Sequence, residues 1–287
     1  MSITPGSTSP TAHQRPGLMG MGRTSGQRSA ELIAAFHALL TPSQETKALS
    51  RPMGRFLARL ISIVARNRPA LNMIPNRRGT ITHLVRDHLQ QNPQCQVVEV
   101  AAGLSTRGLL LGDDFPQSQF IEVDLPDVIA TKRKRLSQHH LQPPANLTWM
   151  TADLVHTPLV DVLDGTDADI IIAEGLLLYF SPIDATSIMK SLLAALKPGG
   201  ILIVDIFNRS EIRALLDGSN SKIAYKLFTR VTGKFQGMVD TLDEAQSWMD
   251  NAGGSDIHLH LLSDSAQQYD LLQPVRDIAL IATCRKS

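Results

Sequence analysis

The chain has 287 residues, of which 43% are hydrophobic and 19% are charged, so it can bury a large core and wholesale disorder is excluded. Its 28 Lys and Arg residues against 27 Asp and Glu residues give a net charge of +1, which argues against a histone-like or ribosomal protein. The two cysteines exclude a disulfide framework and a four-cysteine zinc site, so we expect no metal and a reducing, cytoplasmic location.

The N-terminal part of the chain divides into an unpatterned segment and a helical one. Residues 1–22 are rich in Pro, Gly, Ser and Thr and show no hydrophobic period, which predicts a flexible arm. Apolar residues recur at helical spacing from Gln27 to Leu40, and Pro42 then interrupts the pattern. We therefore expect a helical cap over residues 23–78.

A basic stretch lies in residues 47–86, which hold nine Lys and Arg residues and no Asp or Glu. Arg51, Arg55 and Arg59 are four residues apart and so share one face of a predicted helix. The other face is apolar and is formed by Phe56, Leu57, Leu60, Ile61 and Val64. We expect this helix to steer or dock the substrate, and the alternative is a basic face that is merely solvated.

From residue 80 onward, strands and helices alternate. Short buried strands are predicted at residues 96–100, 119–123, 147–152, 169–173 and 201–207. Helices are predicted at residues 80–91, at 126–138 and from 181 to about 197. Alternation of this kind is typical of a parallel α/β sheet with helices on its faces.

The C-terminal part departs from this alternation. Residues 257–262 and 277–284 are each predicted as a strand, and because no helix is predicted between them we expect them to pair antiparallel. Residues 209–241 are mixed, helical and polar, and they follow the fifth strand at the edge where ligands bind, so we expect a lid there. The predicted fold is thus a Rossmann-like, doubly wound α/β sheet over residues 79–287, mostly parallel with a C-terminal antiparallel hairpin.

Polar groups follow four successive strands of this predicted sheet. The turn at residues 99–103 would bring the backbone close to a ligand, and the alternative is an ordinary tight turn. Asp124 can accept both hydroxyls of a ribose or act as an acid at the start of a helix. Asp153, with Leu154 against the ring, can receive an adenine amino group or serve as a turn residue. Glu174 can hold an ammonium group, so the four together predict one ligand site at the carboxyl edge of the sheet.

Three segments carry a resemblance to a known family. The chain resembles the leucine carboxyl methyltransferase family, which includes bacterial O-methyltransferases of polyketide pathways, in VVEVAAGLSTRGLLL, FIEVDLPDVIATKRKRL and IIAEGLLLYFSP. The resemblance covers about residues 77–207 and, more faintly, the N-terminal helix from Thr24. It implies a class I methyltransferase fold and S-adenosylmethionine as the cofactor.

The resemblance also implies roles for single residues. Gly103 would let the backbone approach the methionine moiety, Asp124 would take the ribose hydroxyls, and Glu174 would face the methionine ammonium. Arg77, expected just before the helix that precedes the first strand, would clamp the methionine carboxylate, with Arg78 as the alternative. The implied cofactor-binding residues are Arg77, Arg78, Glu99, Ala101, Gly103, Asp124, Leu125, Asp153, Leu154, Glu174 and Gly175.

The turn after the first strand departs from the family's usual G-A-G-L-D-T at two positions. Ala101 replaces the first Gly, and Ser105 replaces the acid. Alanine is tolerable at the first position if its φ is negative. These departures are the hints for an alternative of a different class, a non-catalytic S-adenosylmethionine-binding protein.

We predict an S-adenosylmethionine-dependent methyltransferase that acts on an oxygen of a small molecule, in first place a carboxylate, as in natural-product biosynthesis. A carboxylate is already ionised at pH 7 and needs no general base, and none of the nine histidines lies in an obvious site motif. Tyr179, Tyr225 and Arg209 are the predicted substrate-binding residues, and the alternative for Tyr179 is a place in the core. Residues 209–241 mix basic and aromatic side chains, which suits an anionic substrate with an apolar body.

Other partners and activities are disfavoured by motifs that the sequence lacks. The Arg-rich stretch could bind phosphates, which keeps a nucleic-acid methyltransferase as an alternative, but no Asn/Asp-Pro-Pro-Tyr/Phe motif follows the fourth strand and only 5% of residues are aromatic. The turn lacks G-x-G-x-x-G, which disfavours a nicotinamide dehydrogenase. No apolar run approaches the ~20 residues of a membrane span, so no membrane partner is expected.

Overall fold

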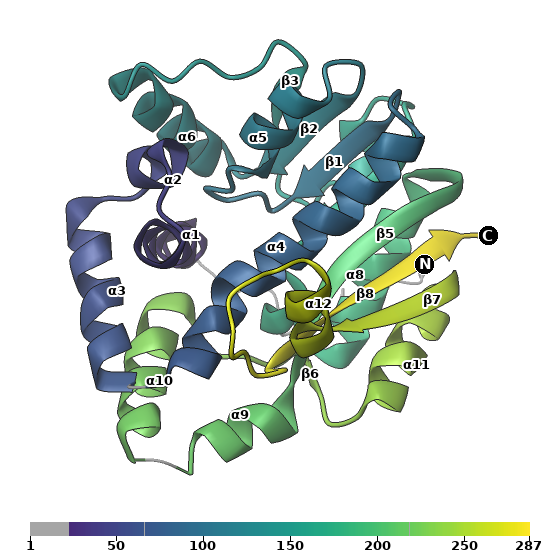
Figure 1. Cartoon of the computed structure of the whole chain (residues 1–287). Helices are drawn as coiled ribbons and strands as arrows, with labels where there is room; N and C mark the ends of the chain where they lie inside the picture. The colour runs from purple at the N-terminus through teal and green to yellow at the C-terminus, as the bar shows by residue number, and fades with distance from the viewer. Residues whose placement is uncertain (1–22, 66, 218) are drawn as a thin grey trace, which may run out of the picture.

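The computed structural model describes residues 23–65, 67–217 and 219–287, so the flexible arm predicted for residues 1–22 lies outside the described residues. Figure 1 shows a twisted sheet with helices packed around it. The strands are β1 (Gln96–Val100), β2 (Gln119–Asp124), β3 (Leu147–Thr151), β4 (Ala168–Ala173), β5 (Leu196–Asn208), β6 (Met238–Val239), β7 (Gly254–Leu261) and β8 (Ala279–Lys286). The five strands predicted for the parallel part are therefore all present.

The sheet has the strand order β3-β2-β1-β4-β5-β8-β7, and the short β6 pairs with β5. Strands β1 to β5 run parallel, and Val98 in β1 lies opposite Ile121 in β2 and Ile171 in β4. Strand β8 pairs antiparallel with both β5 and β7, as predicted for the C-terminal hairpin. A mostly parallel sheet with an antiparallel end is the class I Rossmann-like methyltransferase fold, which confirms the predicted fold class.

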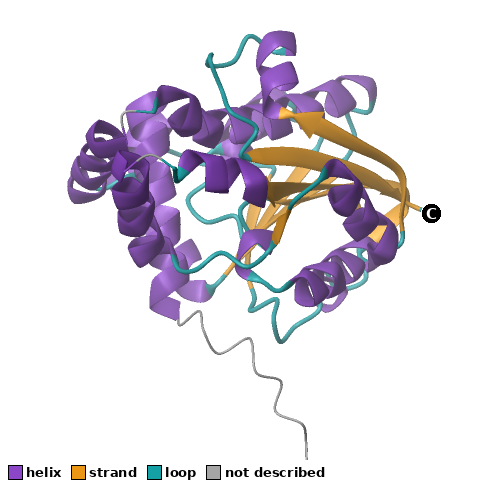
Figure 2. Cartoon of the chain, turned by 90° about the horizontal axis from the view of Figure 1, so that it is seen from below, coloured by secondary structure: helices purple, strands orange, loops and turns teal. Residues whose placement is uncertain are grey.

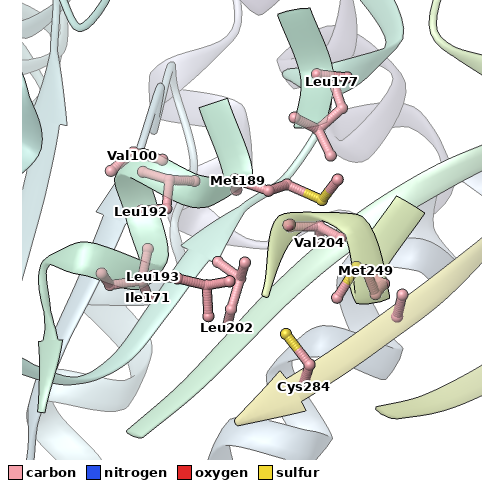
Figure 3. Packing of buried hydrophobic residues seen from close by; sticks show 14 of the residues in the cluster. Val100, Ile171, Leu177, Met189, Leu192, Leu193, Leu202, Val204, Met249 and Cys284 are labelled. Carbon is pink, nitrogen blue, oxygen red and sulfur yellow. The ribbon is translucent and has the colours of Figure 1, made fainter. Parts of the chain in front are cut away.

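Two hydrophobic layers cover the two faces of the sheet. The core helices are α4 (Arg68–Gln91), α5 (Arg107–Asp114), α6 (Pro126–Gln138), α7 (Leu159–Val162), α8 (Pro182–Ala194), α11 (Leu242–Ala252) and α12 (Leu262–Gln268), and a 3-10 turn, η2, spans Leu177–Tyr179. Figure 3 shows one layer, in which Met189 of α8 and Met249 of α11 pack over Leu202 and Val204 of β5. Full burial of these side chains holds the strand ends, and thus the ligand edge, in register.

Two helices differ from the prediction. Helix α4 begins at Arg68 rather than at residue 80, because the Asn67 side chain caps Ala70 and a proline follows in the first turn. Pro75 lies inside α4 and conceals this earlier start, since proline usually ends a helix. The expectation that no helix joins β7 to β8 is wrong: α12 lies there, and its sequence LSDSAQQ has too few apolar residues to show a period.

A layer of helices stands beside the sheet rather than on its faces (Figures 1 and 2). It consists of α1 (Arg23–Leu40), α2 (Gln44–Leu49), α3 (Pro52–Ala65), α9 (Arg209–Leu215) and α10 (Ser219–Thr232). Helix α10 belongs to the segment predicted as a lid, and it packs against α1 and α3. The cap and the insertion after β5 thus meet, although they are far apart in the sequence. None of the helices in the described ranges is both long and apolar enough to cross a membrane.

Candidate active site

A cavity of about 1070 Å³ opens at the carboxyl ends of the parallel strands and extends among α1, α3, α4 and α10. Ordinary ligand pockets measure roughly 300–1,000 Å³, so this one has room for a cofactor and a second molecule. All but one of the predicted site residues line it, namely Arg77, Arg78, Glu99, Ala101, Gly103, Asp124, Leu125, Asp153, Leu154, Glu174, Gly175, Tyr179 and Tyr225.

Arg209 is the predicted site residue that does not line the cavity. Its Nη1 lies 2.5 Å from Oδ2 of Asp240, and its Nη2 donates to the carbonyl oxygen of Met238 at 2.7 Å. The structure therefore places Arg209 outside the cavity lining, because an acid and a carbonyl near β6 hold its guanidinium there. The lining cation that comes from the insertion is instead Lys234, which is exposed.

The turn after β1 is held to the end of β2 by one carboxylate. Asp124 Oδ2 accepts a hydrogen bond from the Gly103 amide, and its Oδ1 accepts one from the Leu125 amide, both at 2.6 Å. The chain reverses sharply here, and Ala101 has φ +49° while Gly103 has φ +56°. The condition under which alanine is tolerable at this position, a negative φ, is therefore not met, and an alanine in this left-handed region costs about 1 kcal/mol relative to glycine.

Glu174, after β4, is the centre of a buried ion network. Its Oε1 lies 3.1 Å from Nε of Arg77, and its Oε2 lies 2.6 Å from Nη2 of Arg107. Arg107 also pairs with Glu99, and Arg77 Nη1 lies 3.1 Å from Asp205 Oδ2. Burial alone would raise the pKa of Glu174, but Arg107 and Arg77 outweigh it and lower that pKa to about 2. Glu174 is therefore a fixed anion on the cavity wall.

Asp205 and Arg107 are members of the ion network that sequence reasoning missed. Asp205, in β5, accepts a hydrogen bond from the Gly175 amide at 2.7 Å and so fixes the loop that follows Glu174. Arg107 is the first residue of α5 and is 1% exposed. The turn after β1 positions its side chain next to Glu99 and Glu174. Asp205 is a charged residue inside the apolar run ILIVDIF, which was the available signal, whereas Arg107 follows Ser105 and Thr106 and offered no such signal.

The two adjacent arginines of α4 occupy different places. Arg77 forms ion pairs with Glu174 and Asp205, and it is 5% exposed. Arg78 lines the cavity and makes no ion pair with any carboxylate of the described residues. Burial, with Arg107 next, lowers the pKa of Arg78 to about 10, so it still carries its charge at pH 7. Arg78, the sequence-based alternative, is thus available to bind a ligand carboxylate. Arg77 and Arg78 both lie inside α4, not just before a helix as the resemblance implied.

The cavity wall beyond β2 and β3 is apolar with one acid at its rim. Leu125, Ala152 and Leu154 line it, next to Asp153. The Asp153 side chain is half exposed, and its Oδ1 accepts a hydrogen bond from the Val155 amide at 3.2 Å. This pairing of a flat apolar wall with an accessible acceptor suits a heteroaromatic ring that carries an amino group. Within the described part of the chain, no cluster of His, Cys, Asp and Glu could hold a metal ion.

The opposite end of the cavity is aromatic. The ring of Phe235 lies 5.8 Å from that of Tyr179 and 5.9 Å from that of Tyr225, in edge-to-face contacts. The Tyr179 hydroxyl lies 2.7 Å from Oγ of Ser29 in α1, so a helix of the cap is tied to the loop after β4. Burial raises the pKa of Tyr179, which is therefore a neutral hydrogen-bonding group.

His37 is a further cavity residue that sequence reasoning missed. It is 5% exposed, it lines the cavity, and its Nδ1 has no hydrogen-bond partner among the described residues. Burial and then Arg78 hold its pKa well below the ordinary histidine range, so it is neutral. Ser29, Ile33 and His37 follow one another at intervals of four on α1 and all line the cavity. That spacing was the sequence signal that could have found them.

Solved structures of other proteins share this fold. A DUF574 family protein from Streptomyces avermitilis has a TM-score of 0.64 at 14% identity, with 90% of this chain and 97% of that chain covered. A putative methyltransferase from Thermobifida fusca has a TM-score of 0.59 at 17% identity, covering 89% and 94%. The S-adenosylmethionine-dependent methyltransferase SibL has a TM-score of 0.51 at 14% identity, covering 74% and 56%, so this chain spans little more than half of SibL. Identities this low show the fold alone.

The family itself comes from the sequence comparison. No curated protein matches the chain at a significant level. The family model for leucine carboxyl methyltransferase matches residues 38–193, which is more than half of the chain. This stretch runs from the end of α1 to α8 and includes the turn after β1, Asp124 and Glu174. The chain therefore belongs to the leucine carboxyl methyltransferase family of S-adenosylmethionine-dependent methyltransferases.

Proposed function

We propose that the chain transfers a methyl group from S-adenosylmethionine to a carboxylate oxygen of a small molecule with an apolar body. The observation that carries the proposal is the division of one cavity into a charged end at the strand termini and an aromatic end under the cap. A cofactor with a ribose, an adenine and an amino acid suits the first end. An apolar acceptor suits the second.

The residues present fit this cofactor. Arg78, a half-buried cation without a carboxylate partner among the described residues, would bind the methionine carboxylate. Glu174 would face the ammonium group, since its own pKa keeps it ionised. Asp124 would accept the ribose hydroxyls while its carboxylate continues to hold the Gly103 amide. Asp153 and Leu154 would frame the adenine.

The bound cofactor supplies an electrophilic methyl group on a positively charged sulfur. The chain's own residues align the acceptor oxygen with that methyl group and exclude water. An anionic acceptor and a cationic donor lose their charges as the reaction proceeds, so an apolar surround accelerates it. Phe235, Tyr179 and Tyr225 provide that surround, and none of the three carries a charge at neutral pH.

Two observations support a carboxylate as the acceptor. The matching family model is described by leucine carboxyl methylation. Exposed Lys234 on the cavity lining could attract an anion without binding its attacking oxygen tightly. Tight binding by a cation would lower the nucleophilicity of that oxygen. The resemblance to polyketide-pathway O-methyltransferases supports a natural-product acceptor.

A hydroxyl acceptor is the second candidate, and His37 is the observation that favours it. A neutral imidazole with an unpartnered Nδ1 could accept the proton that a hydroxyl must lose. Because the pKa of His37 is held well below the ordinary range, activity would be flat between about pH 6 and 8 for either acceptor. A pH profile therefore does not separate them.

The test uses the full chain, S-adenosylmethionine labelled in its methyl group, and a panel of small carboxylic acids and phenols. Transfer to a carboxylate gives an ester that mild alkali hydrolyses, whereas a methyl ether survives. An alkali-labile label supports the proposal, and an alkali-stable label moves the acceptor to a hydroxyl. Calorimetry that shows cofactor binding with no transfer to any acceptor would favour a non-catalytic binding protein.

A further inference from the structure

Helix α3 is apolar on its outer side as well as its inner side. Met53 is 75% exposed, Phe56 66%, Ile63 59% and Leu60 42%. These residues follow one another at intervals of three and four, so they form one stripe along the helix. A stripe of four large apolar side chains on one surface helix differs from the single exposed apolar residues that are normal on proteins.

The neighbouring surface is basic. Helix α3 packs against α10, and neither helix contains an Asp or a Glu (Figure 1). The exposed cations are Arg59 of α3 and Lys222, Lys226 and Arg230 of α10. Exposed Ile223 adds to the apolar area on α10. In a chain whose charges nearly cancel, the exposed side chains of these two packed helices, here called the α3–α10 face, are cationic and apolar, with no acid on either helix.

A second basic feature adjoins the start of α3. A hollow of about 380 Å³ lies between the start of α3 and the end of α6. Its lining includes Arg51 and Lys134, both exposed, and His139. Arg51 lies 3.6 Å from Glu31, so Lys134 carries the excess positive charge of this hollow, at the end of α3 where the helix amides also point outward.

Charge decides between the possible occupants of this face. A second copy of the chain docked by two-fold symmetry would bring the same patch against itself, and hence Arg59 and its basic neighbours against their own equivalents. Like charges opposed in this way disfavour such a dimer. An anionic surface that accepts apolar side chains between its charged groups complements both properties at once.

We propose that the α3–α10 face docks on an anionic lipid surface. A basic helix with projecting Phe, Leu, Ile and Met side chains lies in the plane of lipid headgroups, with its apolar stripe in the acyl boundary. The 14 residues of α3 span about 21 Å, which is too short to cross a bilayer core of about 30 Å. The expectation of no membrane partner rested on the lack of a spanning segment, and surface docking needs none.

This docking places the acceptor end of the cavity next to the lipid. The inner sides of the same two helices line that cavity, through Ile61 and Ala65 of α3 and Ala224 and Phe228 of α10. Docking does not depend on the methyl acceptor proposed above, since it rests on the outer sides of the helices. It can therefore stand or fail independently of the proposed reaction.

The test is co-sedimentation of the full chain with vesicles of phosphatidylcholine alone or with about 30% phosphatidylglycerol. We expect binding to the anionic vesicles to be at least tenfold stronger, and to weaken between about 0.05 M and about 0.5 M salt. The double variant M53S/F56S should bind the anionic vesicles at least tenfold more weakly than the wild type. Removing one cation should weaken vesicle binding about fivefold, and Arg59→Glu should weaken it further because it also adds a negative charge.

Matched controls lie on α8. Ile183→Ser removes an 82% exposed apolar side chain, and Lys190→Glu reverses an exposed charge, so each should bind vesicles as the wild type does. Circular dichroism confirms that each variant is folded. Equal binding to neutral and anionic vesicles, no binding, or equal losses in the α8 controls would overturn the proposal. So would light scattering that shows a dimer which M53S/F56S abolishes, because a second copy would then cover the face.

Discussion

The two ends of the cavity are built on different principles. At the cofactor end, charged side chains from strand termini hold one another in directional pairs, as Arg107 and Arg77 hold Glu174. At the acceptor end, α1, α10 and the residue range 233–236 enclose a space with aromatic and aliphatic groups, centred on Phe235. Directional pairs fix geometry and identify a ligand, whereas apolar walls tolerate exchange among residues of similar volume. The positions of the charged side chains therefore specify the chemical groups of the cofactor, whereas the apolar walls specify only the volume and polarity of the acceptor.

The largest effect should follow from breaking the ion network. Arg107→Met would leave buried Glu99 without its ion-pair partner and Glu174 with Arg77 alone, and the free energy of unfolding should fall by about 3–5 kcal/mol. Urea denaturation measures this change. The control is Arg86→Met, which removes a partly exposed pair with Asp114 and should cost less than about 1 kcal/mol. Equal losses in the two variants would mean that the network is no stronger than a surface pair.

The two arginines of α4 allow the comparison to be sharpened within one helix turn. Arg78→Met should weaken binding of S-adenosylhomocysteine by roughly 1.5–3 kcal/mol, about 10- to 150-fold, because a charged hydrogen bond to the carboxylate is lost. Arg77→Met should mainly lower the free energy of unfolding, since Asp205 loses its ion-pair partner and Glu174 loses one of its two. Calorimetry and urea denaturation on both variants assign the roles, and the reverse pattern would return the carboxylate contact to Arg77.

Asp124 is proposed to contact the cofactor and also holds the turn after β1, so its replacement should affect both cofactor affinity and the stability of the turn. Asp124→Ala should weaken cofactor affinity by roughly 1.5–3 kcal/mol through the lost ribose contacts. It should also loosen the turn, because the Gly103 and Leu125 amides lose their acceptor. Hydrogen exchange at these two amides reports the second effect separately. An unchanged affinity in calorimetry would remove Asp124 from the cofactor site.

At the acceptor end the expected effect is smaller. Tyr179→Phe removes the hydroxyl that meets Ser29, and kcat/KM for the acceptor should fall by an amount equivalent to about 0.5–1.5 kcal/mol, with cofactor affinity unchanged. Ser29→Ala should match it, and the double variant should add little, because both remove the same contact. Additive losses would show that the two side chains act separately.

The smallest effect concerns the backbone of the turn after β1. Ala101→Gly should raise the free energy of unfolding by about 0.5 kcal/mol, because relief of the left-handed strain slightly outweighs the greater freedom of glycine in the unfolded chain. Thermal unfolding should show a correspondingly small rise in Tm. A lower Tm would mean that the surroundings of Ala101 compensate its φ of +49°.

The sequence predicted the parts of the molecule that local patterns determine. Strands such as Gln96–Val100 are short apolar runs between turns, and the polar residues at their ends reached the cavity. His37 was missed because only the docking of α1 over the sheet brings it to the cavity. Arg209 lies outside the cavity lining because its partner, Asp240, is brought to it by the path of the chain after α10, which local pattern does not reveal. The acceptor end is made by packing between elements, and local pattern carries little information about it.

The position of β8 has a consequence for synthesis of the chain. Strand β8 pairs with β5, yet 70 residues separate Asn208 at the end of β5 from Ala279 at the start of β8. At roughly 5–20 residues per second, the ribosome needs about 4–14 s to produce them. During that interval β5 has an open edge that can pair with strands of other nascent chains. Yield of this protein in cells should therefore depend on chaperones that occupy that edge until residues 279–286 arrive.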